Sequence, residues 1–212
     1  NASRNWVNCI AAKEGHDTVD VQVGKETKKY CKYYWGIECK VHQDMAAAIS
    51  KISQEKTHTI PLSWCLDTTG KVLWRQSSLG YSPVHGNGGS PVIVGDRLIF
   101  SGDGANDPFV VALSTKNGEV LWKTARVTLA KKKFSFGTPL ALEVDGATQI
   151  ISPGSGAVCA YDPANGHELW RVLYGEGYSV IPRPVFGHGL LFLASGYDRP
   201  VVHAIRPAGA KG

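Results

Sequence analysis

A tryptophan recurs at one fixed interval along this chain. Trp74, Trp122 and Trp170 are each separated from the next by 48 residues. Each ends a similar stretch, and these stretches read CLDTTGKVLW, ALSTKNGEVLW and AYDPANGHELW in chain order. Turn-forming Asp, Asn, Pro and Gly lie between two apolar ends, which is typical of a tight turn joining two strands. A period of this length predicts a repeat architecture built from one supersecondary unit.

Other features of the sequence recur at nearly the same interval, with prolines 48 and then 45 residues apart. Pro91, Pro139 and Pro184 each precede an apolar run, which suits proline as the first residue of a strand. Further short apolar runs follow each proline, separated by turn residues, and they lack the apolar spacing of a helix. Four short strands in about 40–50 residues make the blade of a β-propeller. The sequence therefore predicts an all-β fold, a partial β-propeller of four-stranded antiparallel blades.

The tryptophan has a physical role in such a fold. On the outer strand of a blade, its ring can lie over the turn of the neighbouring blade and bury roughly 150–250 Å². Small residues and turn glycines at matching positions (Ala112, Ala160 and Ala204 among them) permit that close approach. We expect this role rather than stacking on a cofactor or on bases. The predicted structural docking residues are Trp74, Trp122, Trp170, Gly70, Gly118 and Gly166.

The repeat resembles a known family. Its A-x-D-x-x-x-G-x-x-x-W pattern resembles the tryptophan-docking motif of quinoprotein-like (PQQ-type) β-propellers. The stretches YSPVHGNGGSPV (81–92) and ISPGSGAVCAYDPANGHELWRV (151–172) are similar to the exported PQQ-like repeat proteins of planctomycetes. The resemblance covers about residues 61–212 and implies a periplasmic or secreted protein. Because a ring closes with about four to eight blades, we expect a fragment of a larger propeller.

Residues 1–60 do not follow the period and resemble no family. Alternation at 17–23 predicts a strand, and 29–42, rich in aromatic residues and cysteine, suggests a second strand pair. The stretch 43–55 predicts a short helix with Asp44 at its N-cap. We therefore predict two parts, a small α+β or irregular N-terminal segment (1–60) and the propeller blades (61–212).

Composition excludes several classes. The longest apolar runs of the 212 residues are strand-sized, so no membrane span is predicted. A net charge of +5 with one dense basic run, Lys131 to Lys133, fits a solvated loop better than a nucleic-acid surface. The five cysteines contain no CxxC pair, so zinc and c-type haem lack their usual ligand spacing. Cys31 and Cys39 are either a short disulfide loop or free thiols.

Few residues point to chemistry. By resemblance, a quinoprotein dehydrogenase would need calcium ligands, a catalytic Asp and, in many members, a disulfide between adjacent cysteines, and no adjacent cysteine pair occurs. The weak metal candidates are Asp103, Asn106 and Asp107, whose residue types fit an inter-strand turn better. His85 and Asn87 are the candidate ligand-binding pair on one propeller face. No catalytic residue is predicted.

Two functions follow from these observations. The first is a non-catalytic scaffold for protein or cell-envelope interactions, with no cofactor. The alternative is part of a PQQ-dependent oxidoreductase that uses PQQ and calcium. The expected partners are another protein or further propeller blades, with self-association through open blade edges, since exposed apolar faces favour association. No nucleic-acid partner is expected.

Overall fold

The computed structural model describes residues 18–23, 26–31, 63–67, 70–85 and 88–208, with side chains from residue 63 onward. The chain divides into two compact units, Asn1–Ser78 and Leu79–Gly212, and each is described by itself. The predicted boundary between residues 60 and 61 stays a prediction.

The first unit contains two antiparallel strand pairs. One consists of β1 (Thr18–Val23) and β2 (Glu26–Cys31), and the other of β3 (Ser63–Leu66) and β4 (Val72–Gln76). β1 confirms the strand predicted at 17–23. The helix predicted at 43–55, and Cys39 with its disulfide alternative, lie outside the described residues.

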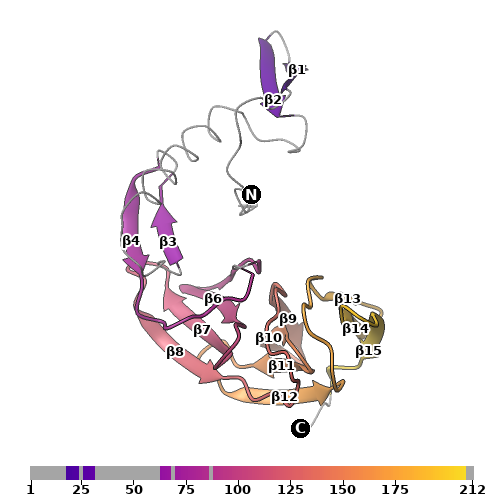
Figure 1. Cartoon of the computed structure of the whole chain (residues 1–212). Helices are drawn as coiled ribbons and strands as arrows, with labels where there is room; N and C mark the ends of the chain where they lie inside the picture. The colour runs from indigo at the N-terminus through magenta and orange to yellow at the C-terminus, as the bar shows by residue number, and fades with distance from the viewer. Residues whose placement is uncertain (1–17, 24–25, 32–62, 68–69, 86–87, 209–212) are drawn as a thin grey trace. The chain divides into compact units, whose positions relative to one another are not determined.

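The second unit consists of three antiparallel sheets that follow one another along an arc (Figure 1). In each sheet the strands pair in chain order, as in a meander. The first sheet contains β5 (Val92–Val94), β6 (Arg97–Gly102), β7 (Phe109–Ser114) and β8 (Val120–Ala125). The second contains β9 (Leu140–Val144), β10 (Ala147–Pro153), β11 (Ala157–Tyr161) and β12 (Glu168–Leu173). The third contains β13 (Val185–Gly187), β14 (Leu190–Ser195) and β15 (Val201–Ile205).

The three tryptophans occupy the same register position. Trp74 lies opposite Cys65, Trp122 opposite Ala112 and Trp170 opposite Ala160. A register shift directly follows the partner residue in all three strand pairs. A bulge of this kind increases the local twist and redirects a side chain. The 48-residue period therefore marks a repeated local structure, as the sequence predicts.

The turn before each tryptophan is also the same. Its glycine has a positive φ, 84° at Gly70, 74° at Gly118 and 73° at Gly166, a conformation that other residues rarely adopt. In the last two turns the glycine N–H donates to the carbonyl of the residue four positions before it, Ser114 or Asp162. The recurring glycine is thus explained by the backbone of the turn.

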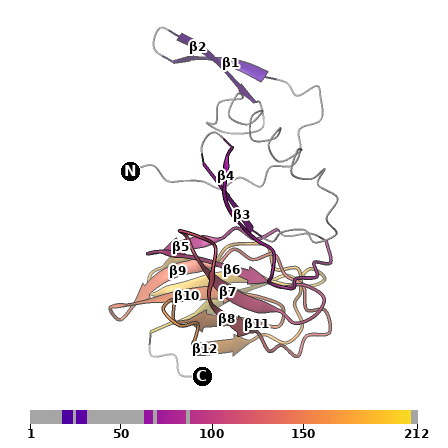
Figure 2. The ribbon, with the colours of Figure 1, turned by 90° about the vertical axis from the view of Figure 1, so that its left-hand side faces the viewer.

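The second sheet is buried on both faces. On one face Cys159 and Tyr161 of β11 belong to a cluster with Ile99, Val110 and other residues of the first sheet. On the opposite face Val158 and Ala160 cluster with residues of β14. All five residues of β11 are buried, because its odd and even positions pack against different neighbours. Figure 2 shows the first two sheets packed one behind the other.

The third sheet has three strands and buries one face. Along β14 buried and half-buried positions alternate, which is the pattern of a strand with one face packed and the other open. Valines of β13 and β15 are exposed, with 65% of Val185 and 74% of Val202 accessible. In the described part of the chain the sheets form an open arc. The fold is therefore an all-β partial propeller, as the sequence predicts, and self-association stays a prediction.

Trp122 joins the first blade to the second. Its indole N–H donates a hydrogen bond of 2.9 Å to the carbonyl oxygen of Pro163, in the turn between β11 and β12. A methyl group on Gly166 would lie 2.6 Å from Trp122 Cδ2, so the ring lies directly against this glycine. Thr124 of β8 adds a 2.7 Å hydrogen bond to the Gly166 carbonyl. The outer strand of one blade thus contacts the turn of the next.

Trp170 makes a different hydrogen bond from the equivalent position. Its indole N–H donates to Gln149 Oε1 of its own blade at 2.8 Å. Its ring still packs toward the next blade, in a cluster with Leu191 and Leu193 of β14. The docking role of the tryptophans and glycines stays a prediction, and Trp122 offers the direct test.

We expect Trp122→Ala to lower the free energy of unfolding by about 3–5 kcal/mol. The substitution removes a ring that is 8% exposed and leaves a cavity between two blades. Urea denaturation followed by circular dichroism measures the effect. An unchanged midpoint would show that the ring does not hold the blades together.

Two glycines provide a matched control for this contact. Gly166 and Gly146 have similar φ values, 73° and 78°, so alanine strains the backbone equally at both. A methyl group at Gly146 meets no atom within 4 Å, whereas one at Gly166 overlaps Trp122. Gly166→Ala should therefore be more destabilising by about 1–3 kcal/mol. This excess should shrink in a Trp122→Ala background, since only the overlap of the added methyl group with Thr124 Oγ1, at 2.7 Å, then remains.

Candidate functional site on the loop face

Loops from all three blades gather at one end of the strands. In a meander, connections alternate between the two ends of a sheet, so the second-to-third and fourth-to-first connections share one end. We call this end the loop face. It comprises the described parts of residues 79–91, 103–108, 126–139, 154–156, 174–184 and 196–200.

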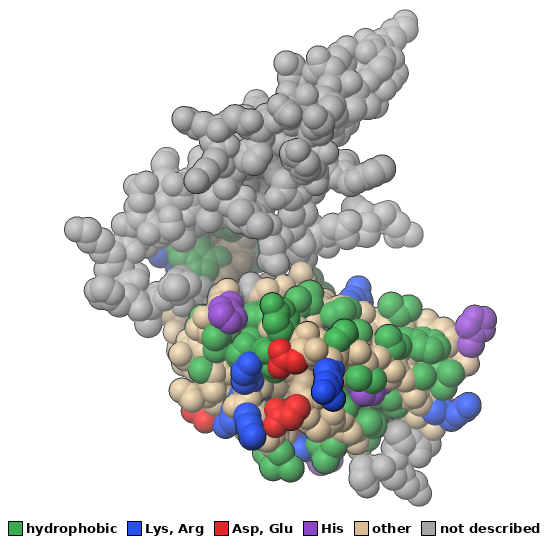
Figure 3. All heavy atoms as spheres, turned by 45° about the vertical axis from the view of Figure 1, so that its right-hand side comes forward, with side chains coloured by type: hydrophobic (Ala, Val, Ile, Leu, Met, Phe, Trp, Pro, Cys, Tyr) green, Lys and Arg blue, Asp and Glu red, His purple; other side chains and the backbone are tan. Residues whose placement is uncertain are grey.

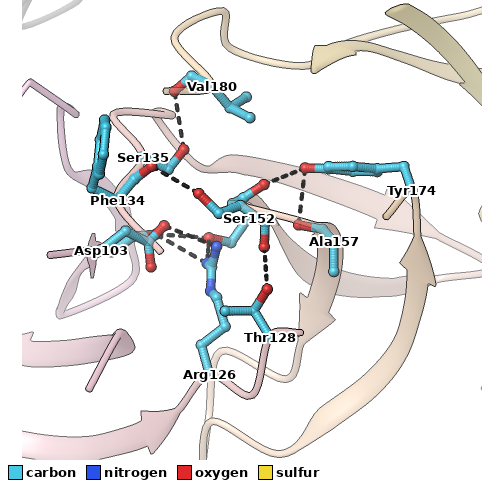
Figure 4. A network of polar contacts seen from close by, with 12 residues as sticks. Asp103, Arg126, Thr128, Phe134, Ser135, Ser152, Ala157, Tyr174 and Val180 are labelled. Atoms are coloured by element: carbon cyan, nitrogen blue, oxygen red, sulfur yellow. Dashed lines mark hydrogen bonds and ion pairs between the residues drawn. The ribbon is translucent and has the colours of Figure 1, made fainter. Parts of the chain in front are cut away.

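A buried ion pair lies beneath the loop face. Asp103 directly follows β6 and Arg126 directly follows β8, so the meander brings both to the same end of the first blade. Arg126 Nη1 lies 3.0 Å from Asp103 Oδ2, and both side chains are 1% exposed (Figure 4). Such a pair persists in an apolar interior only when further hydrogen bonds satisfy it.

The second blade supplies one of those hydrogen bonds, whereas Asp103 Oδ1 and Arg126 Nε are buried without a hydrogen-bond partner among the described residues. Arg126 Nη2 donates to Ser152 Oγ of β10, and Ser152 also shares a 2.7 Å hydrogen bond with Ser101 of β6. Tyr174 donates its hydroxyl to the carbonyls of Gly154 and Ala157. The polar groups between the two blades therefore form a connected network (Figure 4).

Gly154 makes room for the ion pair. A methyl group there would lie 2.9 Å from Arg126 Cζ and 3.2 Å from Asp103 Oδ2. The absence of a side chain at this position thus allows the guanidinium of the first blade to reach the backbone of the second.

Burial governs the ionisation of the pair. It raises the pKa of Asp103 to about 6, although the neighbouring Arg126 favours the charged carboxylate and opposes this rise. Burial also acts to lower the pKa of Arg126, but Asp103 and nearby groups overcome it and raise the pKa, so the guanidinium stays charged. Burial raises the pKa of Tyr161 and Tyr174 in the same region, which keeps both phenols neutral.

The predicted metal candidates do not form a common site. Asp103 is buried against Arg126, whereas Asn106 and Asp107 are exposed, and Asp107 has a left-handed φ of 47°. Within the described residues no three His, Cys, Asp or Glu side chains come together to hold a metal ion. Asp103 is thus separated from the other two candidates by its burial against Arg126.

Five rings form a row across the loop face, and we call it the ring row. His85 packs edge-on against Phe134 with centroids 5.2 Å apart, and Phe136 lies beside both. Tyr178 continues the row at 5.3 Å from Phe134, and Tyr197 follows at 5.9 Å. His85 and Tyr197 are exposed, and the other three rings are half-buried. Asn87, the predicted companion of His85, lies outside the described residues.

Backbone hydrogen bonds fix the spacing of the row. The loop that carries Phe134 and Phe136 pairs with the loop of the next blade that carries Tyr178. Ser179 N–H donates to the Phe134 carbonyl at 3.0 Å, and Phe136 N–H donates to the Val180 carbonyl at 2.8 Å. Ser135 Oγ donates to the same carbonyl at 3.1 Å. The rings are therefore presented on paired backbone.

A pocket of about 370 Å³ opens at one end of the ring row. Its walls are residues 131–132, 176–178 and 196–199, from three loops of the second and third blades. Acidic, basic and tyrosine side chains line it together. Figure 3 shows acidic and basic side chains gathered side by side among hydrophobic ones on one face of this unit. Apart from the basic run Lys131 to Lys133, no pattern in the sequence indicated this pocket.

Comparison with known proteins identifies the fold. A family model described as outer membrane protein assembly factor BamB matches residues 61–209. This chain belongs to that family. The PQQ-like propeller repeat expected from the sequence is thereby confirmed, whereas the closer resemblance to exported planctomycete proteins stays a prediction. No curated protein matches the chain.

Solved structures are similar to this chain over part of their length. BamB from Moraxella catarrhalis is 23% identical with a TM-score of 0.46, covering 61% of this chain and 39% of its own. A europium-containing methanol dehydrogenase is 15% identical with a TM-score of 0.44. The match covers 63% of this chain and 26% of the dehydrogenase. Quinohemoprotein alcohol dehydrogenase from Comamonas testosteroni is 14% identical with a TM-score of 0.45. The match covers 62% of this chain and 29% of that enzyme. The chain thus spans less than half of each of these proteins.

The ion pair predicts a pH dependence of stability. The pKa of Asp103 is about 6 in the folded chain and about 4 in an unfolded one. Between these values the folded chain retains a proton that the unfolded chain has lost, so the free energy of unfolding falls as pH rises from about 4 to about 6. Relative to an Asp103→Asn variant, wild type should lose roughly 2–3 kcal/mol over this window.

Urea denaturation of both proteins at several pH values measures this difference. Asparagine has nearly the shape of aspartate and does not titrate, so it isolates the carboxyl group. If wild type instead gains stability relative to Asp103→Asn as pH rises from about 4 to about 6, the attraction of Arg126 for the Asp103 carboxylate outweighs the effect of burial on its pKa.

Proposed function

We propose that this chain is a non-catalytic propeller scaffold that binds partners of the cell envelope, a protein or a surface polymer, through its loop face. The observation that carries this proposal is the ring row, which crosses from the first blade to the third. Aromatic rings supply large contact areas with little conformational entropy to lose, and they are enriched where proteins meet partners.

Exposed aliphatic residues of the same loops support the proposal. Accessible fractions are 62% for Val127, 87% for Leu129 and 64% for Ile181. Isolated exposed apolar residues are common on protein surfaces, but several on the two loops that also carry rings of the row favour a binding surface. Tyr197 adds to them with 71% of its surface exposed.

The buried polar groups support a structural rather than catalytic use of this region. Asp103 is held by Arg126, and Ser152 is engaged by both Arg126 and Ser101. A catalytic acid or base must reach a substrate proton at hydrogen-bond distance. These side chains instead join two blades beneath the surface.

The family supports an envelope location. Its description names an outer membrane assembly factor, and the sequence resemblance implies export, so we place the protein in the periplasm or outside the cell. No helix in the part of the chain described by the structure is long and apolar enough to cross a membrane. Further propeller blades, or a second copy at the open third sheet, complete the set of proposed partners.

Site-specific photocrosslinking tests the use of the loop face. A benzophenone amino acid replaces His85 or Tyr197 in separate variants, and Asp145, exposed in the turn between β9 and β10 at the opposite end, is the control position. After incubation with envelope extract of the source organism, we expect discrete adducts from the two loop-face positions and few from the control. Equal adduct patterns at all three positions would contradict the proposal.

A quinone titration tests the alternative oxidoreductase function. We expect no saturable binding of PQQ in the presence of calcium and no dye-linked alcohol oxidation. The reason is that the candidate ligands Asp103, Asn106 and Asp107 do not share one site for a calcium ion. Quinone absorbance and dye reduction measure binding and turnover, with a known quinoprotein dehydrogenase as the positive control. Saturable binding at micromolar quinone, accompanied by turnover, would overturn the scaffold proposal.

A further inference from the structure

The pocket at the end of the ring row combines two kinds of recognition group. Tyr178 and Tyr197 lie with their ring centres 5.9 Å apart at an interplanar angle of 36°, and we call these two neighbouring, tilted rings the platform. Tyr197 is largely exposed and has a ring available for contact. Carboxylates and cations border this platform, so it offers hydrogen-bond acceptors and donors together.

The middle of the pocket is held in place by one chain of contacts. Lys132 Nζ donates to the Tyr178 hydroxyl at 2.9 Å and lies 4.0 Å from the centre of the same ring. The Tyr178 hydroxyl in turn donates to Asp198 Oδ1 at 3.1 Å. The hydrogen bond to Tyr178 raises the pKa of Lys132, and Asp198 and Glu176 add to this effect, so the lysine stays charged. These contacts organise the platform before any ligand arrives.

Two positively charged groups of the pocket, on Lys131 and Arg199, are available to a ligand. Glu176 accepts a hydrogen bond from the backbone N–H of Lys131, and Asp198 accepts one from Tyr178. Among the described residues, neither the Lys131 ammonium nor the Arg199 guanidinium has an ion-pair partner. The wall therefore favours an anion, while its carboxylates can still accept hydrogen bonds from hydroxyl groups.

We infer that this pocket binds an acidic oligosaccharide, a short chain of uronic-acid units, an inference that rests on the proposed function of the loop face. The apolar face of a sugar ring stacks on Tyr197, its hydroxyls donate to Asp198 and Glu176, and its carboxylate pairs with Lys131 or Arg199. An acidic peptide suits the pocket less well, because it has few hydroxyl groups to donate to Glu176 and Asp198 and no sugar ring to stack on Tyr197. The volume of about 370 Å³ lies within the usual range for ligand sites.

Calorimetry with defined saccharides tests the inference on the full chain. The probes are tetragalacturonate and tetramannuronate, with neutral tetragalactose and a tetraglutamate peptide for comparison. We expect saturable binding of at least one uronate, tighter than binding of either comparison probe and weakened by added salt. Tyr197→Ala should weaken uronate binding about tenfold, the effect of losing one ring contact.

Charge variants separate the sugar contacts from the charge contacts. Arg199→Gln should reduce the preference for uronate over tetragalactose, whereas Lys116→Gln, an exposed lysine in the turn between β7 and β8 at the opposite end, should leave it unchanged. Circular dichroism verifies that each variant is folded. Failure of both uronates to bind, or equal binding of tetraglutamate, would overturn the inference. The crosslinking at His85 would still decide the proposed function separately.

Discussion

The contact between Trp122 and the turn of the following blade is where the first two blades of this unit meet, and we predict that their packing depends on it. A single four-stranded sheet has two apolar faces and cannot bury them alone, so each blade requires its neighbours. The indole supplies a large apolar ring, a hydrogen bond to Pro163 and a surface that matches Gly166. The ring and the preceding turn recur with the repeat, but the hydrogen bond differs, since Trp170 donates to Gln149 of its own blade.

The polar network between the first two blades adds directional specificity to this apolar packing. Arg126 comes from one blade and Ser152 from the other, so correct pairing of the charges requires correct placement of the sheets. A buried ion pair contributes little net stability, but a misplaced one is strongly unfavourable. The network therefore disfavours alternative blade arrangements more than it strengthens the native one.

The sequence predicted the fold well, because repeated spacing reports repeated local structure. The tryptophan period located equivalent outer strands and their turns without knowledge of the fold, whereas the bulge beside each tryptophan was not predicted. It did not predict the pairing of Asp103 with Arg126, since residues 23 positions apart meet only through the meander. The ring row was also missed, apart from His85, because its members come from different loops and have no common spacing. Local patterns reveal strands, whereas sites that depend on tertiary contacts do not appear in them.

The two-sided burial of β11 has a practical consequence at Cys159. This thiol is fully buried in the seam between the first two blades, and burial raises its pKa, so it is both inaccessible and poorly nucleophilic in the closed structure. A thiol reagent can modify it only when the blades separate. The rate of its modification therefore measures how often this seam opens, and the chain carries its own reporter of blade separation.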